Sequence, residues 1–172
     1  MITISDTTHE ERVYSLIEQI FEQNSITYDF SDYSVTSVEQ NTSESSTIFN
    51  SLMKLSPINT NLQLPNLTLG YNRSNLEDIV SNNNLKIVTA TRTSTAYSLL
   101  KELNAQLLSA NLIIDESDVH NTFVANQPSP DNAFLTLHAL PESFFYISQA
   151  RVPIELFNYA LRGAVKVTIT DK

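Results

Sequence analysis

The sequence predicts an α+β fold made of two tandem related units, residues 1–82 and 83–172, each a helix packed on a mostly antiparallel β-sheet. Three observations predict this: two amphipathic helical segments, several short segments in which apolar and polar residues alternate, and an internal similarity at a constant offset of 83 residues. The offset pairs residues of the same type or character, among them Tyr14-Ser15-Leu16 with Tyr97-Ser98-Leu99, Ile20 with Leu103, and Asp32 with Asp115. This favours a duplication, although short identities also arise by chance in a sequence of biased composition.

Two helices are expected, over residues 8–24 and 94–109. In the first, apolar residues recur at spacings of three and four, which places on one face Val13, Leu16, Ile17, Ile20 and Phe21. The second repeats this pattern with Leu99, Leu100, Leu103 and Leu107. Thr7 or Thr8 ahead of Glu10 and Glu11 resembles a capping box, and Ser94 or Thr95 is the expected cap of the second helix.

The remaining elements are expected to be strands, because apolar and polar residues alternate or apolar residues cluster in short runs between turn residues. The expected strands are residues 2–4, 33–38, 48–55, 67–72, 85–90, 135–140, 144–148, 152–156 and 165–169. Pro153 predicts that its strand lies at a sheet edge or contains a bulge, because proline has no N–H to donate. The polar stretches 40–46 and 126–132 are expected to be loops, either solvated connectors or contacts to a neighbouring molecule.

Composition and charge disfavour several classes of partner. The formal net charge of −9 repels phosphate backbones and anionic lipid, so neither nucleic acid nor a membrane is an expected partner. The apolar runs are far shorter than the roughly 20 residues needed to cross a bilayer, and no secretion signal is expected at the start of the sequence. The absence of cysteine removes disulfides and thiolate zinc sites and fits a reducing cytoplasm.

No catalytic, cofactor-binding or metal-binding residue is predicted, and the chain is not expected to be an enzyme. His9, His120 and His138 are far apart in the sequence, with no second histidine at a metal-ligand spacing. The acidic group at residues 115–118 lacks the glycine and the distant glutamate of a calcium-binding hand, and we interpret it as a solvated turn. Two glycines in the whole chain leave no room for a glycine-rich phosphate loop or a nucleophile elbow.

The tripeptide Tyr71-Asn72-Arg73 is the most distinctive local motif. An arginine at the end of a strand, beside an aromatic residue and an asparagine, can pair with a carboxylate or hold a turn through several hydrogen bonds. We interpret Tyr71, Asn72 and Arg73 as structural, and we expect Arg151 to be the counterpart of Arg73 in the second unit.

The order of these motifs resembles modules of virion structural proteins from giant tailed bacteriophages of the phiKZ-like type. The resemblance covers about two thirds of the chain. It is carried by residues 67–76 (LTLGYNRSNL), followed by Leu85-Lys86-Ile87, Leu99-Leu100, Leu103-Asn104, residues 112–115 (LIID) and residues 134–137 (FLTL). The chain departs from the family in having few glycines, so the hairpin loops of those modules are not carried over.

The resemblance implies a non-catalytic component of a virion, assembled in the cytoplasm of the bacterial host and bound to other virion proteins in a symmetric homo- or hetero-oligomer. Tail and baseplate are slightly favoured over the head. The alternatives are a capsid-associated minor or decoration protein, and a soluble module that recognises the host.

Overall fold

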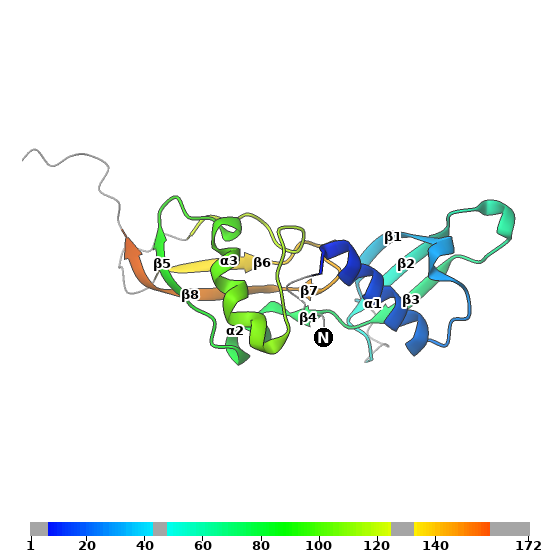
Figure 1. Cartoon of the computed structure of the whole chain (residues 1–172), viewed down its shortest axis with the longest axis horizontal. Coiled ribbons are helices and arrows are strands. Elements are labelled where there is room, and N and C mark those ends of the chain that lie inside the picture. Colours follow the sequence, from blue (N-terminus) through cyan, green and yellow to red (C-terminus); the bar gives the residue numbers. More distant parts are fainter. Residues whose placement is uncertain (1–6, 43–47, 125–132, 159–172) are drawn as a thin grey trace, which may run out of the picture.

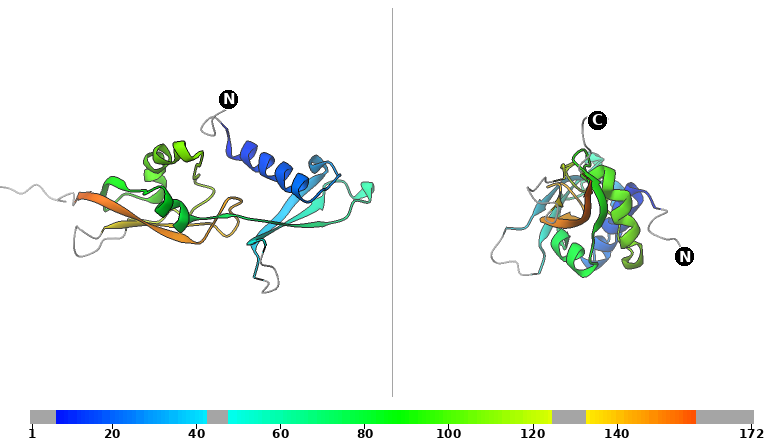
Figure 2. Two further views of the ribbon diagram at one scale, coloured as in Figure 1. Left: turned by 90° about the horizontal axis from the view of Figure 1, so that it is seen from below. Right: turned by 90° about the vertical axis from the view of Figure 1, so that its left-hand side faces the viewer.

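The structure is a computed structural model that describes residues 7–42, 48–124 and 133–158, with side chains as far as Glu155. Two lobes follow one another along the long axis of an elongated molecule (Figures 1 and 2). The N-terminal lobe (residues 7–71) and the C-terminal lobe (residues 74–158) are each built around a separate core of buried apolar side chains. Helices pack beside an antiparallel sheet in the N-terminal lobe and beside mixed parallel and antiparallel strands in the C-terminal lobe, which confirms the predicted α+β class.

The N-terminal lobe is one helix on a three-stranded antiparallel sheet. Helix α1 (His9–Gln23) is followed by β1 (Tyr33–Gln40), β2 (Ser51–Pro57) and β3 (Leu67–Tyr71), in the order β1-β2-β3. Thr8 and Glu11 form the predicted capping box, in which each side chain accepts a hydrogen bond from the other's backbone N–H. The core contains Ile17, Ile20, Phe21, Tyr33, Met53, Leu55, Leu69 and Tyr71.

The C-terminal lobe has a mixed sheet with two helices. It contains β4 (Ser74–Asn75), α2 (Leu76–Asn82), β5 (Ile87–Thr91), α3 (Ala96–Leu107), β6 (Phe134–His138), β7 (Tyr146–Ile147) and β8 (Gln149–Asn158). The main sheet has the order β5-β8-β6, with β5 parallel and β6 antiparallel to β8. A short parallel pair, β4 and β7, lies beside the N-terminal lobe (Figure 1). Three 3-10 turns complete the described elements: Phe30–Asp32, Thr60–Leu62 and Leu108–Ala110.

The chain passes from the N-terminal core to the C-terminal core before the predicted boundary between residues 82 and 83. Helix α2 precedes that boundary, yet its buried side chains Leu76, Ile79 and Val80 belong to the C-terminal core. The change from one core to the other therefore falls between Tyr71 and Leu76.

The duplication stays a prediction. The offset of 83 residues carries α1 onto residues 92–106, most of which lie in α3. However, α1 precedes every strand of its sheet, whereas α3 follows β5, and only the N-terminal lobe has a purely antiparallel sheet.

Pro153 lies in the central strand of its sheet, so the expectation of an edge position is wrong. The N–H of the next residue, Ile154, donates to the carbonyl of Ala133 on the β6 side. Because backbone groups alternate along a strand, the nitrogen of Pro153 faces the β5 side, where pairing begins only at Ile154 with Ile87. The missing N–H therefore falls where the parallel ladder has not yet begun.

Four of the predicted segments cannot be compared with the structure. Residues 2–4, 126–132 and 165–169 lie outside the described residues, as does most of the predicted loop at 40–46. Among the helices that are described, none is long and apolar enough to cross a membrane.

Candidate functional site

The buried polar side chains of the molecule gather where the two lobes meet. Two arginines of the N-terminal half, Arg12 on α1 and Arg73 after β3, are 8% and 4% exposed, and both reach residues of the C-terminal lobe. We call this region the junction: Arg12, Arg73 and the two C-terminal segments that they contact, residues 111–118 and 139–147.

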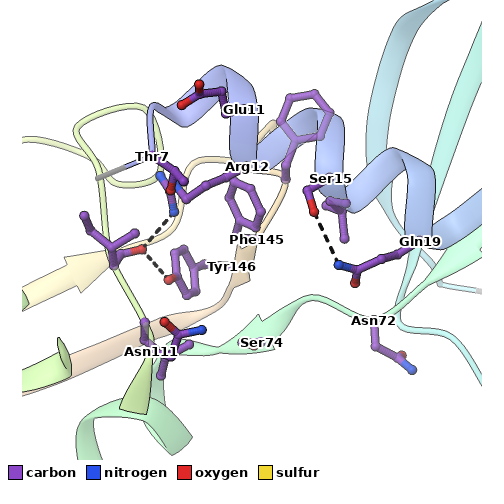
Figure 3. A pocket seen from close by; sticks show the side chains of 14 residues that line it. Thr7, Glu11, Arg12, Ser15, Gln19, Asn72, Ser74, Asn111, Phe145 and Tyr146 are labelled. Carbon is purple, nitrogen blue, oxygen red and sulfur yellow. Dashed lines mark hydrogen bonds between the residues drawn. The ribbon is translucent and has the colours of Figure 1, made fainter. Parts of the chain in front are cut away.

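Arg12 enters the junction from the first turns of α1. Its guanidinium forms an ion pair with the carboxylate of Asp115, and its Nη1 donates to the carbonyl of Ile113 at 3.3 Å. The hydroxyl of Tyr146 donates to the same carbonyl at 2.6 Å, so the two side chains converge on it (Figure 3). The Phe145 ring covers the guanidinium, with 4.8 Å from Cζ to the ring centre. An arginine that is both paired and stacked holds α1 against the second lobe.

Two further ionisable groups, His9 and Asp118, lie beside this ion pair. Nδ1 of His9 lies 3.3 Å from the Asp115 carboxylate and 3.0 Å from the hydroxyl of Ser117. Asp118 is fully buried, and it accepts hydrogen bonds from the backbone N–H of Asp115 at 3.0 Å and from the hydroxyl of Ser143 at 2.8 Å. Burial raises the pKa of Asp118, and these hydrogen bonds oppose the rise.

The ligand atoms of His9, Asp115 and Asp118 lie within 4.8 Å of one another, a spacing that a metal ion requires. However, the Asp115 carboxylate is already paired with the Arg12 guanidinium. A metal ion bound to Asp115 would have to compete with that positive charge. The interpretation of residues 115–118 as a solvated turn is wrong for Asp118. Its side chain is an internal acceptor that holds the loop to Ser143.

Arg73 anchors the other side of the junction through backbone carbonyls. Its Nε donates to the Ser51 hydroxyl at 2.7 Å, and its Nη1 donates to the carbonyls of Pro141 at 3.0 Å and Ser143 at 2.9 Å. One guanidinium thus joins β2 of the first lobe to a loop of the second. Burial lowers the pKa of Arg73 from its ordinary value.

The other residues of the Tyr71-Asn72-Arg73 motif support the same connection. The Tyr71 hydroxyl donates to the carbonyl of Phe144 at 3.1 Å, and burial raises the pKa of Tyr71 to about 12. Asn72 accepts from the N–H of Asn50 at 2.9 Å and donates to the carbonyl of Ile48 at 3.1 Å, which fixes the start of β2. Every member of the motif therefore forms a tertiary hydrogen bond, and its interpretation as structural stays a prediction.

Arg151 is not placed like Arg73. It is an exposed residue of β8, opposite Thr136 on β6, and its Cζ lies 4.6 Å from the centre of the Phe134 ring. It lies away from the junction, so the expected correspondence with Arg73 is not seen.

An open cleft of about 560 Å³ runs along the junction between α1 and the C-terminal lobe (Figure 3). Its polar lining includes Thr7, Glu11, Ser15, Gln19 and Asn111. Glu11 already accepts two hydrogen bonds from Thr8, which lower the pKa of Glu11. The cleft presents hydrogen-bonding groups, and its ionisable side chains are engaged in helix capping and in the ion pair of Arg12.

A family model matches residues 3–171, and its description is a family of unknown function, DUF7941. The chain belongs to the DUF7941 family. No curated protein and no solved structure matched the chain. The DUF7941 match covers both lobes and the junction, so the two lobes lie within a single family unit.

Sequence reasoning identified the Tyr71-Asn72-Arg73 motif but missed Arg12. Arg12 stands four residues before Leu16 and eight before Ile20, which places a cation on the apolar face of α1. That position was a usable signal, since a charge on a buried face requires a partner. The identity of that partner, Asp115, was not predictable, because it lies 103 residues away in the sequence.

Proposed function

We propose that this DUF7941 protein is a non-catalytic structural component of the virion of a large tailed bacteriophage, where it works by making contacts with other virion proteins. A position in the tail or baseplate is favoured slightly over one in the head. The proposal is supported by the resemblance of residues 67–137 to virion modules and by the architecture of the junction.

The observation that carries the proposal is the use of buried polar groups to fasten one lobe to the other. Arg12 and Arg73 join segments that are 101 and 70 residues apart, respectively, and neither points its charged group at open solvent. An enzyme or small-molecule receptor usually exposes such groups in its pocket, where they can act on a ligand. Here they hold an elongated two-lobed body in one arrangement, which suits a part that bridges neighbours in an assembly.

Phe144 and Phe145 strengthen this connection without polar groups. Phe144 packs against the N-terminal core, although it belongs to the C-terminal lobe, whereas Phe145 packs against the C-terminal core and covers Arg12. Adjacent residues thus insert into different cores, and the lobes cannot separate without exposing both rings.

A host-recognition module is the second candidate, and one exposed side chain favours it. Phe123 is 68% exposed and lies just before the proline-containing segment 126–132, whose structure is outside the described part. Aromatic residues are enriched at protein-binding interfaces.

Mass spectrometry of purified particles separates these candidates, with the copy number measured and with heads and tails analysed separately. A virion component is expected at a fixed copy number per particle and in one fraction. Absence of the protein from washed particles would reject the proposal. A host-recognition module that acts free in solution would instead be found in the lysate.

A further inference from the structure

The last residues of the chain contain a strand-like sequence outside the described part. Val165, Val167 and Ile169 alternate with Lys166, Thr168 and Thr170, the pattern of a strand with one apolar and one polar face. The DUF7941 match extends to residue 171, so this pattern lies within the family region.

The outer edge of β5, one side of the nearest sheet, is already hydrogen-bonded by α3. The N–H of Val88 donates to Glu102 at 2.6 Å. The backbone of Lys86 exchanges two hydrogen bonds with the side chain of Gln106, at 3.2 and 2.7 Å. An additional strand would have to displace both side chains of α3.

The outer edge of β6, the other side of that sheet, is covered by residues 119–122. The carbonyl of Thr136 accepts from the Thr122 hydroxyl at 2.6 Å, and the carbonyl of His138 accepts from the N–H of His120 at 2.9 Å. The sheet of the C-terminal lobe is therefore a poor acceptor for another strand.

Strand β1 offers a better edge. It is an edge strand of eight residues, and the N–H of the following Asn41 donates across to Asn50 beside β2. Because backbone groups alternate along a strand, those of Val38 and Gln40 point away from β2. Val38–Gln40 also line a hollow of about 440 Å³. Its other wall contains the apolar residues Ala139, Leu140, Pro141 and Ile147 together with Arg73 and Ser148. An added strand would find backbone partners along β1 and a place nearby for apolar side chains.

The charges of the two parts are complementary. Residues 7–72 contain eight carboxylates and two Lys or Arg residues, a net charge of −6, whereas residues 159–172 contain three Lys or Arg residues and one carboxylate, a net charge of +2. Opposite charges steer such partners together and favour this pairing over others.

The chain between the two parts is too short for pairing within one molecule. Strand β8 starts beside the junction and runs 10 residues to the far end of the C-terminal lobe (Figure 1). The nine intervals of the strand, at about 3.3 Å each, give a length of roughly 30 Å, while the seven intervals from Asn158 to Val165 span at most about 25 Å. Val165 therefore cannot return to β1 of its own chain.

We infer that residues 165–170 of one copy add as a strand to the β1 edge of the next copy, which links copies of this protein head to tail. Such a contact joins two different surfaces, so repetition gives a ring when the rotation closes and a filament when it does not. The inference stands apart from the virion proposal, because it concerns contacts between copies of the purified chain.

A pair of proline variants tests this contact by complementation. Gln40→Pro removes an N–H that faces away from β2, and Val167→Pro interrupts the added strand; Gln40→Thr and Val167→Thr are the matched controls. Size-exclusion chromatography with light scattering, at high micromolar concentration, should show wild type and both controls as multiples of 19.3 kDa and each proline variant as a single chain. Mixing the two proline variants should give a species of two chains, because each retains the half that the other lacks. A monomeric wild type, or a mixture that stays monomeric, would overturn the inference.

Disulfide trapping gives a second readout that does not depend on proline, because the chain has no cysteine of its own. Gln40→Cys is combined in one chain with either Lys166→Cys or Thr168→Cys and then oxidised. Linked copies should appear as a ladder on a non-reducing gel. A bond that closes within one chain, seen as a fast-migrating monomer, would contradict head-to-tail exchange.

Discussion

Replacing Arg73 by methionine removes the side chain that ties the two lobes together while keeping much of its volume. The change deletes the hydrogen bonds to Ser51, Pro141 and Ser143, and it leaves the acceptors of the buried residues Ser51 and Ser143 without this donor. Hydrogen bonds from a charged donor contribute about 1.5–3 kcal/mol each, and three of them give roughly 4.5–9 kcal/mol. The cost of burying the guanidinium, several kcal/mol, offsets part of this. We expect a net loss of about 2–4 kcal/mol in the free energy of unfolding.

Urea denaturation followed by circular dichroism measures this loss. With a denaturant slope of about 2 kcal/mol per M for a chain of this size, the midpoint should fall by roughly 1–2 M. Arg73→Lys is the matched control. It keeps the positive charge but not the planar guanidinium, so its urea midpoint should lie between those of wild type and Arg73→Met. A midpoint for Arg73→Met within about 0.3 M of wild type would refute the claim that this guanidinium holds the lobes together.

Three further predictions test individual parts of the structure. Burial raises the pKa of Asp118, so the folded state binds its proton more tightly than the unfolded chain does. The free energy of unfolding of wild type relative to Asp118→Asn should therefore fall as pH rises above 3.8. A difference that stays flat between about pH 3 and 7 in urea titrations would contradict this. A Cβ at Gly70 would come 2.8 Å from Cγ of Phe49, so Gly70→Ala should lower the free energy of unfolding by about 1–3 kcal/mol. In a double-mutant cycle, Phe49→Ala should relieve most of that loss. Thr8→Ala removes the α1 cap and should cost about 1 kcal/mol in thermal unfolding, whereas Thr8→Ser should be nearly neutral; equal effects of the two would exclude the capping role.

The helices with strong periodicity were predictable from the sequence. The expected ranges 8–24 and 94–109 enclose α1 and α3, because a long apolar face specifies both the helix and the side that is buried. Helix α2 was missed because it has only seven residues, although its buried Leu76, Ile79 and Val80 have helical spacing. Most strands were placed within a few residues, since alternation is a local signal.

Strand order and the junction were not predictable in the same way. The central position of β8 was not predictable, because Pro153 favours an edge strand and the sequence does not show that pairing with β5 begins only after it, at Ile154. The burial of Asp118 depends on Ser143, which is 25 residues away and meets it only in the folded chain. The sequence thus predicted the local elements, while the tertiary partners of Arg73 and Asp118 had to come from the structure.

The central claim is that the junction holds the two lobes in one fixed arrangement, and a distance measurement across it is the most direct test. Spin labels at Asn61→Cys and Lys101→Cys place one exposed probe in each lobe of a chain that has no other cysteine. Electron paramagnetic resonance should give one narrow distance distribution for this pair, and adding Arg12→Ala with Arg73→Met should broaden it. A broad distribution with both arginines intact would contradict the account.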